Sequence, residues 1–408
     1  MSRILAYTAP ARGQLFPLAA ILEELHGRGH EISVRTLEGA LPGMRSRGFE
    51  AAAISPEVEA IEMDDWRSRT PPGAMIRATR VFAERAPHDA RDLDQAIDEV
   101  SPDAVLIDAA ATGALSAAEA WGGPWGATCP FPLPLSSRFG PPMGPGLRPA
   151  RGRPGRLRDR AVQAGSNLAL ERISVAALNP LRAARGLPPF TDAGDVLSAP
   201  PLLLYTSAEP FEYRHPDWPA SVVMVGPCAW EPPGELPAQL GGVEEPLVLV
   251  TASTEFQDDG RLAQIAFDAL AEEPVHVVTT VPAADLEALR PPANGTALGF
   301  APHGPILARA ACAVTHGGMG GTQKALASGV PVCVVPFGRD QYEVAQRVVV
   351  NRAGTKLPSP LLSPSRLRRA VREAMRCREG AQRVAGGFTA AGGPAAAADA
   401  VEQRLLQA

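Results

Sequence analysis

The chain has 408 residues, which favours two domains over one. A hydrophobic fraction of 45% supplies enough apolar side chains for two cores and excludes a disordered chain, and a formal net charge of -5 excludes whole-protein attraction to nucleic acid or to an anionic membrane. The five cysteines are scattered without metal-ligand spacing, and the first residues carry no secretion signal, so we expect a reduced, cytoplasmic protein with no membrane span.

The first elements in chain order predict a parallel sheet. A strand is expected over residues 3–9, an amphipathic helix over 14–30 and a second strand over 31–37. The leucines of the helical segment recur at helical spacing, and glycines end it. Further strands are expected over 103–110 and 122–131, with an alanine-rich helix between them. A strand, a helix and a strand within about 35 residues form a βαβ unit, which requires parallel strands.

Two loop-like segments interrupt this rhythm. Residues 132–160 are rich in Pro, Gly and Arg without periodicity, which predicts a long loop. This segment is interpreted either as a solvated surface loop or as a flexible, basic wall over a substrate cleft. Residues 206–244 are also loop-like, and 231–244 are expected to link two domains.

After the linker the alternation of strands and helices resumes. The predicted organisation is an N-terminal domain over 1–230, the linker over 231–244, a C-terminal domain over 245–390, and a closing helix over 391–408 that packs back on the N-terminal domain. The fold class is therefore α/β, with two Rossmann-like domains facing each other across a cleft. In such sheets ligands bind beyond the carboxyl ends of the strands.

A glycine-rich loop follows the apolar run that ends at Thr315. His316 stands at its mouth, and four glycines come within the next five positions: Gly317, Gly318, Gly320 and Gly321. Such a loop exposes backbone N–H groups, and the following helix directs its positive end to the same place, which predicts a phosphate site. Thr322 is expected to cap that helix or to donate its hydroxyl to a phosphate oxygen. The alternative is a tight strand-to-helix turn with no ligand.

Residues 300–354 contain several motifs in a fixed order: a Phe-x-Pro turn, the His-Gly-Gly loop, a short helix, a Gly-Val-Pro strand and an Asp-Gln pair. This order resembles the donor-binding signature of GT-B glycosyltransferases. It is most similar to the bacterial antibiotic-type branch, whose members decorate natural products with sugars from nucleotide donors. The opening βαβ unit and the chain length resemble that family more weakly.

The resemblance implies a donor site of three parts. The diphosphate would be held by His316, Gly317, Gly318, Met319, Gly320 and Thr322, together with Ser253 and Thr254 after the first strand of the C-terminal domain. The nucleotide base would be bordered by Phe300, Ala301 and His303. The sugar hydroxyls would be bound by Asp340 and Gln341, although this pair alone also fits an ordinary helix start with Asp340 as the N-cap.

One position departs from the family pattern inside the donor signature. Family members often carry a Glu in the helix after the glycine loop, where it meets the ribose hydroxyls. The comparable residue here is Lys324, which leaves the ribose contact without its usual carboxylate. The lysine is expected to face phosphate or solvent instead.

The resemblance also raises the question of the catalytic base. Many relatives place a histidine after the first strand, oriented by an Asp from a later strand. Gln14 occupies the histidine position here and cannot act as a base, whereas Asp108 matches the orienting Asp. Three readings stay open: an acceptor acidic enough to need no histidine, Asp108 or an acceptor-side carboxylate as base, directly or through water, or a C-linked or N-linked product.

The acceptor is expected to bind near residues 59–93, where relatives carry variable loops. Trp66 and Phe82 are candidates to pack against the aglycone, and Asp64, Asp65 or His88 to contact it; each is also interpreted as ordinary packing or as part of a solvated face. The Asp-x-Asp pattern at 92–94 resembles a metal motif but lies in a helical pattern, so it is interpreted as a solvated helix face.

The predicted function is an inverting, metal-independent glycosyltransferase that moves a deoxysugar from a dTDP donor, or a UDP donor, to a lipophilic natural product in antibiotic biosynthesis. No cofactor, metal, nucleic acid or membrane partner is expected, and a homodimer is left open. Two alternatives remain: a non-catalytic nucleotide-sugar-binding homologue or partner protein, and a nucleotide-sugar epimerase of related fold.

Overall fold

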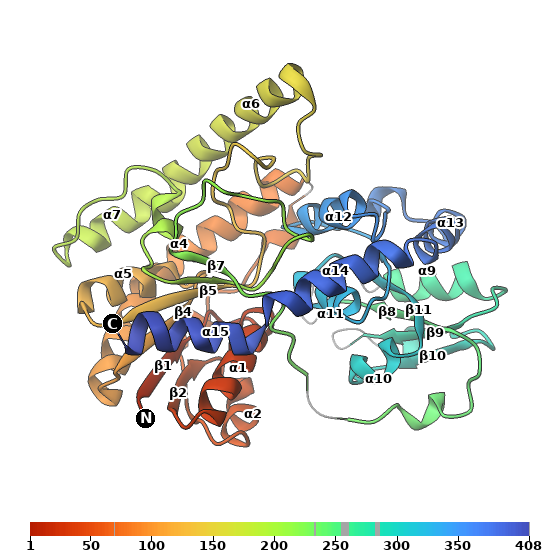
Figure 1. The fold of residues 1–408 in the computed structure, drawn as a ribbon, viewed down its shortest axis with the longest axis horizontal. Coiled ribbons are helices and arrows are strands. Elements are labelled where there is room, and N and C mark those ends of the chain that lie inside the picture. Colours follow the sequence, from red (N-terminus) through yellow and green to blue (C-terminus); the bar gives the residue numbers. More distant parts are fainter. Residues whose placement is uncertain (69, 232–233, 254–260, 282–285, 408) are drawn as a thin grey trace.

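The protein folds into two α/β halves, each built on one parallel sheet (Figure 1). The computed structural model describes residues 1–68, 70–231, 234–253, 261–281 and 286–407. The N-terminal half has a seven-stranded sheet of order β3-β2-β1-β4-β5-β6-β7, and the C-terminal half has a six-stranded sheet of order β10-β9-β8-β11-β12-β13. Every strand pairing among the described residues is parallel, as the βαβ patterns predict.

The elements of the N-terminal half alternate along the chain. Its strands are β1 (Arg3–Tyr7), β2 (Glu31–Thr36), β3 (Glu50–Ala53), β4 (Ala104–Asp108), β5 (Trp125–Cys129), β6 (Leu203–Tyr205) and β7 (Val222–Met224). Its helices are α1 (Arg12–Gly27), α2 (Leu41–Arg45), α3 (Pro56–Glu59), α4 (Pro71–Val100), α5 (Thr112–Trp121), α6 (Gly152–Leu170), α7 (Ala176–Ala183) and α8 (Asp195–Ser198).

The C-terminal half repeats this alternation. Its strands are β8 (Leu247–Thr251), β9 (His276–Thr280), β10 (Gly295–Leu298), β11 (Ala310–Thr315), β12 (Val332–Val334) and β13 (Gly354–Lys356). Its helices are α9 (Arg261–Leu270), α10 (His303–Leu307), α11 (Met319–Ala327), α12 (Gln341–Val350), α13 (Pro364–Met375), α14 (Arg378–Ala391) and α15 (Pro394–Val401).

The strands are apolar along their length because helices cover both faces of each sheet. In β1, Ile4 and Ala6 face a core shared with α1 and α15, whereas Leu5 and Tyr7 face a second core shared with α4 and α5. Successive side chains of a strand point to opposite faces, so both sets are buried at once. This arrangement leaves the loops beyond the carboxyl ends of the strands as the place for polar chemistry.

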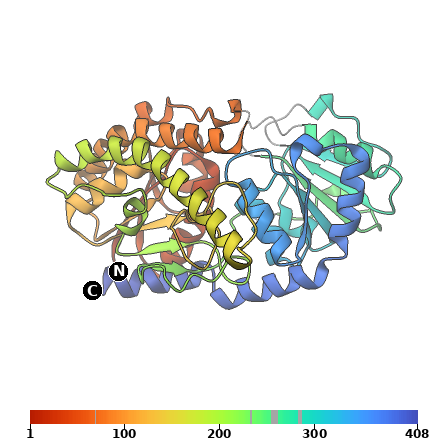
Figure 2. The same ribbon diagram turned by 90° about the horizontal axis from the view of Figure 1, so that it is seen from above.

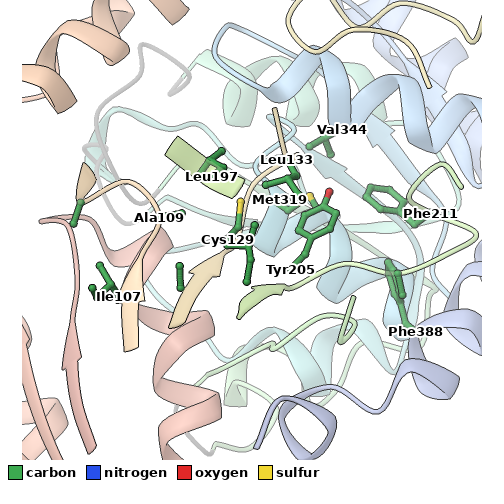
Figure 3. Packing of buried hydrophobic residues seen from close by; sticks show 14 of the residues in the cluster. Ile107, Ala109, Cys129, Leu133, Leu197, Tyr205, Phe211, Met319, Val344 and Phe388 are labelled. Atoms are coloured by element: carbon green, nitrogen blue, oxygen red, sulfur yellow. The ribbon is translucent and has the colours of Figure 1, made fainter. Parts of the chain in front are cut away.

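The second core continues from one half into the other. Met319 and Val344 of the C-terminal half belong to the same buried cluster as Leu133, Tyr205 and Phe211 of the N-terminal half. Figure 3 shows these side chains meeting where the halves join. The two sheets are therefore held together by apolar burial as well as by the covalent connection.

The C-terminal segment crosses back to the N-terminal half. Helix α14 is capped by the left-handed Gly392, and α15 then lies against α1. Figure 2 shows these last helices in blue along the lower edge of both halves. Arg28, the C-cap residue of α1, donates to Asp399 at 2.6 Å and to Glu402 at 2.8 Å. These contacts fasten the last helix to the first domain's sheet, although the domain boundaries named above stay predictions.

Two segments expected to be loops contain regular structure. Helix α6 begins at Gly152, inside the predicted loop 132–160, and β7 lies within 206–244. In α6, Pro154 sits in the first turn, where its missing N–H costs nothing, so a local proline signal there does not exclude a helix. Strand β7 has only three residues and is specified by its pairing with β6.

Candidate functional site

A cleft of about 1580 Å³ lies between the two halves and is lined by residues of both. Pockets for one drug-sized ligand span roughly 300–1,000 Å³, so this cleft has room for two substrates. The lining includes residues at or just beyond the ends of β1, β4, β5, β8, β9 and β11, which places the cleft at the carboxyl ends of both sheets.

The glycine loop forms one wall of the cleft between β11 and α11. Gly317 has a φ of +97°, and a Cβ there would lie 2.9 Å from the Cβ of Gln341. Only glycine adopts this conformation without strain and admits this approach. The loop is therefore pressed against the first turn of α12, which brings the phosphate and sugar motifs predicted from sequence together.

Gly318 and Gly320 differ in what lies where a side chain would be. A Cβ on Gly318 would lie 2.4 Å from Nε2 of His316, so the imidazole occupies the place of a side chain. A Cβ on Gly320 would have no heavy atom within 4 Å. Gly320 lies in the first turn of α11 and lines the cleft. The positive end of α11 thus faces open volume, as an anion site requires.

Thr322 does not have the place expected for it. The helix begins at Met319 with Gly318 as its N-cap, so Thr322 is inside the helix and the capping prediction is wrong. Its side chain is fully buried, and its hydroxyl is hydrogen-bonded to that of Thr315 at 3.0 Å. Thr322 is absent from the described lining of the cleft and fastens α11 to β11 instead.

The other predicted diphosphate contacts follow β8. Ser253 is buried and lines the cleft together with Thr251, which ends that strand. Thr254 lies outside the described residues. His316, Gly318, Met319 and Gly320 also line the cleft, so these members of the group meet Ser253 at one place, whereas Gly317 and Thr322 are not among the described lining residues.

The predicted base contacts line the cleft beside β9. Phe300 is 66% exposed, which leaves its ring free for a planar ligand, whereas Ala301 is buried. Nε2 of His303 lies 3.0 Å from the hydroxyl of Thr280. Burial, reinforced by the charge of Lys324, lowers the pKa of His303 to about 4, so its imidazole is neutral at pH 7.

Lys324, which the sequence predicts to face phosphate or solvent, lines the cleft and is paired with a carboxylate. Its Nζ donates to Glu231 at 2.9 Å, and the same carboxylate accepts the backbone N–H groups of His303 at 2.9 Å and Gly304 at 2.8 Å. Glu231 comes from the segment that connects the halves, and both side chains line the cleft. A carboxylate therefore lies in the donor region, supplied by a residue 93 positions away in sequence.

Asp340 and Gln341 both line the cleft at the start of α12. Gln341 is nearly buried, and its Oε1 accepts the backbone N–H groups of Phe337 at 2.7 Å and Gly338 at 3.0 Å, which fixes the turn. Asp340 occupies the N-cap position but makes no side-chain capping bond. Burial raises the pKa of Asp340 to about 6, which leaves it ionised at pH 7.

Gln14 and Asp108, the two predicted catalytic-site residues, differ in whether they reach the cleft. Gln14 lines the cleft, and its buried Oε1 has no hydrogen-bond partner in the described part of the chain. Asp108 is fully buried and is not among the described lining residues. Its oxygens accept the backbone N–H groups of Ala9 at 3.2 Å and Ala110 at 3.1 Å. Asp108 therefore ties together the loops after β1 and β4.

Two buried carboxylates of α4, Asp89 and Asp92, lie against the end of β1. The hydroxyl of Tyr7 is within hydrogen-bond distance of Asp89 (3.2 Å) and Asp92 (3.1 Å) on α4. Burial raises the pKa of Asp89 to about 8 and that of Asp108 to about 7. The interpretation of residues 92–94 as a solvated face is wrong for Asp92, which is buried, and right for Asp94, which pairs with Arg185 at the surface.

Of the acceptor candidates Trp66, Phe82 and His88, two line the cleft and one does not. Trp66 and Phe82 line the cleft, but His88 does not; it lies on α4 beside Arg91, at 3.0 Å, so its acceptor role is not supported. Sequence reasoning missed Met75 and Leu170, which add apolar surface from α4 and α6. For the α6 residues, the Pro- and Gly-rich start of that helix masked its periodicity.

Asp64 and Asp65 make ion pairs. Asp64 binds Arg77 on α4, whereas Asp65 binds Arg339 of the other half. Within the described residues, no group of three or more His, Cys, Asp or Glu side chains is placed to hold a metal ion. None of the helices in the described part combines the length and apolar character that a bilayer crossing requires.

Comparison with known proteins agrees with this geometry. Residues 264–403 match the family profile "Erythromycin biosynthesis protein CIII-like, C-terminal domain". The 4'-demethylrebeccamycin synthase of Lentzea aerocolonigenes is 32% identical over 388 residues, which cover 91% of each chain.

Solved structures share the fold over nearly the whole chain. The glycotransferase of kitacinnamycin superposes with a TM-score of 0.76 at 24% identity, covering 99% of both chains. The glycosyltransferase VinC, solved in complex with dTDP, superposes with a TM-score of 0.70 at 22% identity over 100% of both. The protein therefore belongs to the GT-B glycosyltransferases of the antibiotic-biosynthesis branch.

Proposed function

We propose that this glycosyltransferase inverts the anomeric centre as it moves a sugar from a dTDP-linked donor to a lipophilic natural product. The observation that carries the proposal is the open volume at Gly320, at the N-terminus of α11, next to the turn that holds Asp340 and Gln341. One cleft thus offers an anion site and hydroxyl-binding groups side by side. A nucleotide diphosphate-sugar needs both.

The chemistry follows from these parts. The acceptor nucleophile attacks the anomeric carbon, the bond to the diphosphate oxygen breaks, and the nucleoside diphosphate leaves. The helix end, the loop N–H groups and His316 stabilise the negative charge that develops on the leaving oxygen. This stabilisation works without a metal ion, and metal independence is part of the proposal.

A dTDP donor is favoured over a UDP donor by comparison alone. VinC was solved with dTDP, and its fold matches over the full length of this chain. The base region supplies an exposed Phe300 ring and a neutral His303, which suit a pyrimidine without choosing between thymine and uracil. Measuring the affinities of dTDP and UDP for the protein decides which nucleotide the donor carries.

A lipophilic acceptor is supported by the wall of the cleft in the N-terminal half. Trp66, Met75 and Phe82 present large apolar side chains there, and Leu170 of α6 adds to them. An apolar, ring-containing aglycone gains by burying its surface against such a wall. Burial of the sugar acceptor in this region also keeps water from competing for the donor.

Asp108 does not reach the cleft, so it cannot take a proton directly from the acceptor. Three hypotheses fit the structure: an acceptor whose own group loses its proton readily, relay from Asp108 through water, and an acceptor-side carboxylate as base, for which Glu59 and Glu62 line the cleft. Where the nucleophile still carries its proton, Oε1 of Gln14 accepts a hydrogen bond from it and orients it. O-, N- and C-linked products all remain compatible with this arrangement.

The non-catalytic and epimerase alternatives are not retained, because the relatives of this chain are glycosyltransferases. A cytoplasmic location and a homodimer stay predictions.

The test is a His316→Ala variant compared with wild type. Loss of a charge-assisted hydrogen bond to phosphate costs about 1.5–3 kcal/mol, so dTDP affinity should fall by roughly 10- to 150-fold. Calorimetric titration with dTDP and UDP measures it. Equal affinity in the two proteins would remove His316 from the donor site.

A further inference from the structure

One loop of the N-terminal half is anchored in the C-terminal half by a single side chain. Oε1 of Glu343, on α12, accepts the backbone N–H groups of Gly144 at 2.9 Å and Gly146 at 2.7 Å. These glycines belong to the long loop after β5, about 200 positions earlier in the chain. Glu343 is 1% exposed, so its carboxylate is enclosed by these partners.

The fit of the loop against α12 depends on glycine. Gly146 has a φ of +62°, and a Cβ there would lie 2.3 Å from the carbonyl oxygen of Tyr342. Any side chain at this position would push the loop away from the helix. The contact therefore needs both the carboxylate of Glu343 and the absence of a side chain at Gly146.

Glu343 is itself held in place. Its Oε2 accepts from Arg347 at 2.9 Å, and Arg347 also donates to Glu212 of the N-terminal half at 2.8–3.0 Å. Although burial alone would raise it, the Arg347 charge and the hydrogen bonds hold the pKa of Glu212 at about 2. Beside this network, Val344 packs in the apolar cluster that contains Tyr205 (Figure 3). The orientation of Glu343 is thus fixed by groups from both halves.

The anchored loop borders the place assigned to the donor sugar. Met143, Gly144 and Pro145 line the cleft, and so do Asp340, the N-cap of α12, and Gln341, its first residue, which stand within three positions of Glu343. One helix therefore carries both the proposed sugar ligands and the anchor of the loop that faces them. The wall beside the sugar is built from both halves at once.

We propose that Glu343 is a positioning residue that holds loop residues 143–146 over the donor sugar. This contact joins a wall of the N-terminal half to the sugar site of the C-terminal half. The inference rests on the proposed placement of the sugar at Asp340 and Gln341. It extends that placement by naming a wall that the N-terminal half contributes. Glu343 acts through the loop and does not contact the reacting atoms.

A second carboxylate, Asp217, binds the same loop at other residues and provides a matched control. Asp217 accepts the hydroxyl of Ser137 at 2.7 Å and the backbone N–H of Arg138 at 2.8 Å, and it belongs to the same half as the loop. An Asp217→Ala variant removes a carboxylate anchor of the same kind, six or more positions from Gly144. It separates general loosening of the loop from loss of the anchor on α12.

The experiment is hydrogen–deuterium exchange of the peptide that spans residues 141–151, without ligand, with dTDP, and with dTDP-glucose; UDP and UDP-glucose form a parallel series. In Glu343→Ala, exchange without ligand should rise at least tenfold. Glu343→Gln keeps an acceptor oxygen and should stay within about threefold of wild type. Asp217→Ala should loosen residues near 138 but leave 144–146 protected.

The sugar supplies the second readout. In wild type, the sugar nucleotide should slow exchange of this peptide at least threefold more than the nucleoside diphosphate does, and Glu343→Ala should lose that difference. Affinity for the diphosphate alone should stay within twofold in every variant. Unchanged exchange in Glu343→Ala would overturn the anchor, and equal protection by diphosphate and sugar nucleotide in wild type would overturn the placement over the sugar. Failure of wild type to bind any of these nucleotides would instead defeat the proposed function, while the exchange without ligand still decides the anchor.

Discussion

Asp65 of the N-terminal half and Arg339 of the C-terminal half form a bidentate ion pair across the cleft. The two contacts measure 2.5 and 2.7 Å, and the Asp65 side chain is 2% exposed. Arg339 has a φ of +50° and directly precedes the Asp340–Gln341 pair. The sugar turn is therefore linked to the N-terminal half on both sides, by Arg339 before it and Glu343 after it.

Removing the Asp65–Arg339 ion pair should weaken the contact between the two halves and so lower the stability of the protein. Arg339→Ala leaves the buried Asp65 without its guanidinium, and hydrogen bonds to charged groups contribute about 1.5–3 kcal/mol each, so the thermal midpoint should fall by several degrees. Arg369→Ala, at an exposed position on α13, serves as the control and should leave the midpoint within one degree or so. A midpoint equal to the control would mean that the pair does not hold the halves together.

Gly320→Ala should change stability and ligand affinity in opposite directions. The position is helical and open, so alanine should stabilise α11 by about 0.5–1 kcal/mol. The added methyl group projects toward the space assigned to the diphosphate, so dTDP should bind at least tenfold more weakly. Thermal unfolding and calorimetry measure the two effects. A variant that binds dTDP as wild type does would place the phosphate elsewhere.

The buried Asp89 should make folding stability depend on pH. Burial raises its pKa to about 8, above the value near 3.9 of an unfolded chain, so the folded state binds the proton more tightly. Stability is then fully present at low pH and is lost as pH rises through about 8, on the order of 1 kcal/mol per unit between pH 5 and 8. Asp89→Asn keeps an acceptor for Tyr7 and should flatten this slope in urea titrations. Parallel slopes for the two proteins would exclude Asp89 as the cause.

Asp340 should confer a different pH dependence, on binding of the sugar. Its pKa is raised to about 6 by burial, and sugar hydroxyls donate better to the ionised carboxylate. The ratio of dTDP-glucose affinity to dTDP affinity should therefore fall by up to about tenfold from pH 7.5 to pH 5. Asp340→Asn should make the ratio independent of pH. A pH-dependent ratio in that variant would assign the effect to another group.

Much of this architecture is visible in the sequence because it depends on local pattern. The βα alternation predicts both parallel sheets, and the glycine loop predicts the turn that brings Gly317 against α12 and His316 to the cleft. These features follow from side-chain period and from conformations that only glycine adopts. The prediction fails for Thr322, because its hydroxyl finds a partner in Thr315 across a strand–helix contact.

The missed features depend on residues far apart in the chain. The Glu231–Lys324 pair and the Glu343 anchor join segments that no local pattern relates. Helical periodicity places Asp92 and Asp94 on α4, but the depth of burial of each follows from what packs on that helix. Asp92 is buried because a strand tyrosine, Tyr7, needs a partner for its hydroxyl.

The most direct test of the account is the binding of dTDP, UDP, GDP and ADP to wild type and to Gly320→Ala, each with Mg²⁺ and with a chelator. A ligand that binds only the folded state raises the thermal midpoint. We predict that dTDP or UDP raises the midpoint of wild type equally with and without Mg²⁺, and that Gly320→Ala loses most of this shift. A wild type that responds to none of the four nucleotides, or a variant that responds as wild type does, would contradict the donor site at the glycine loop.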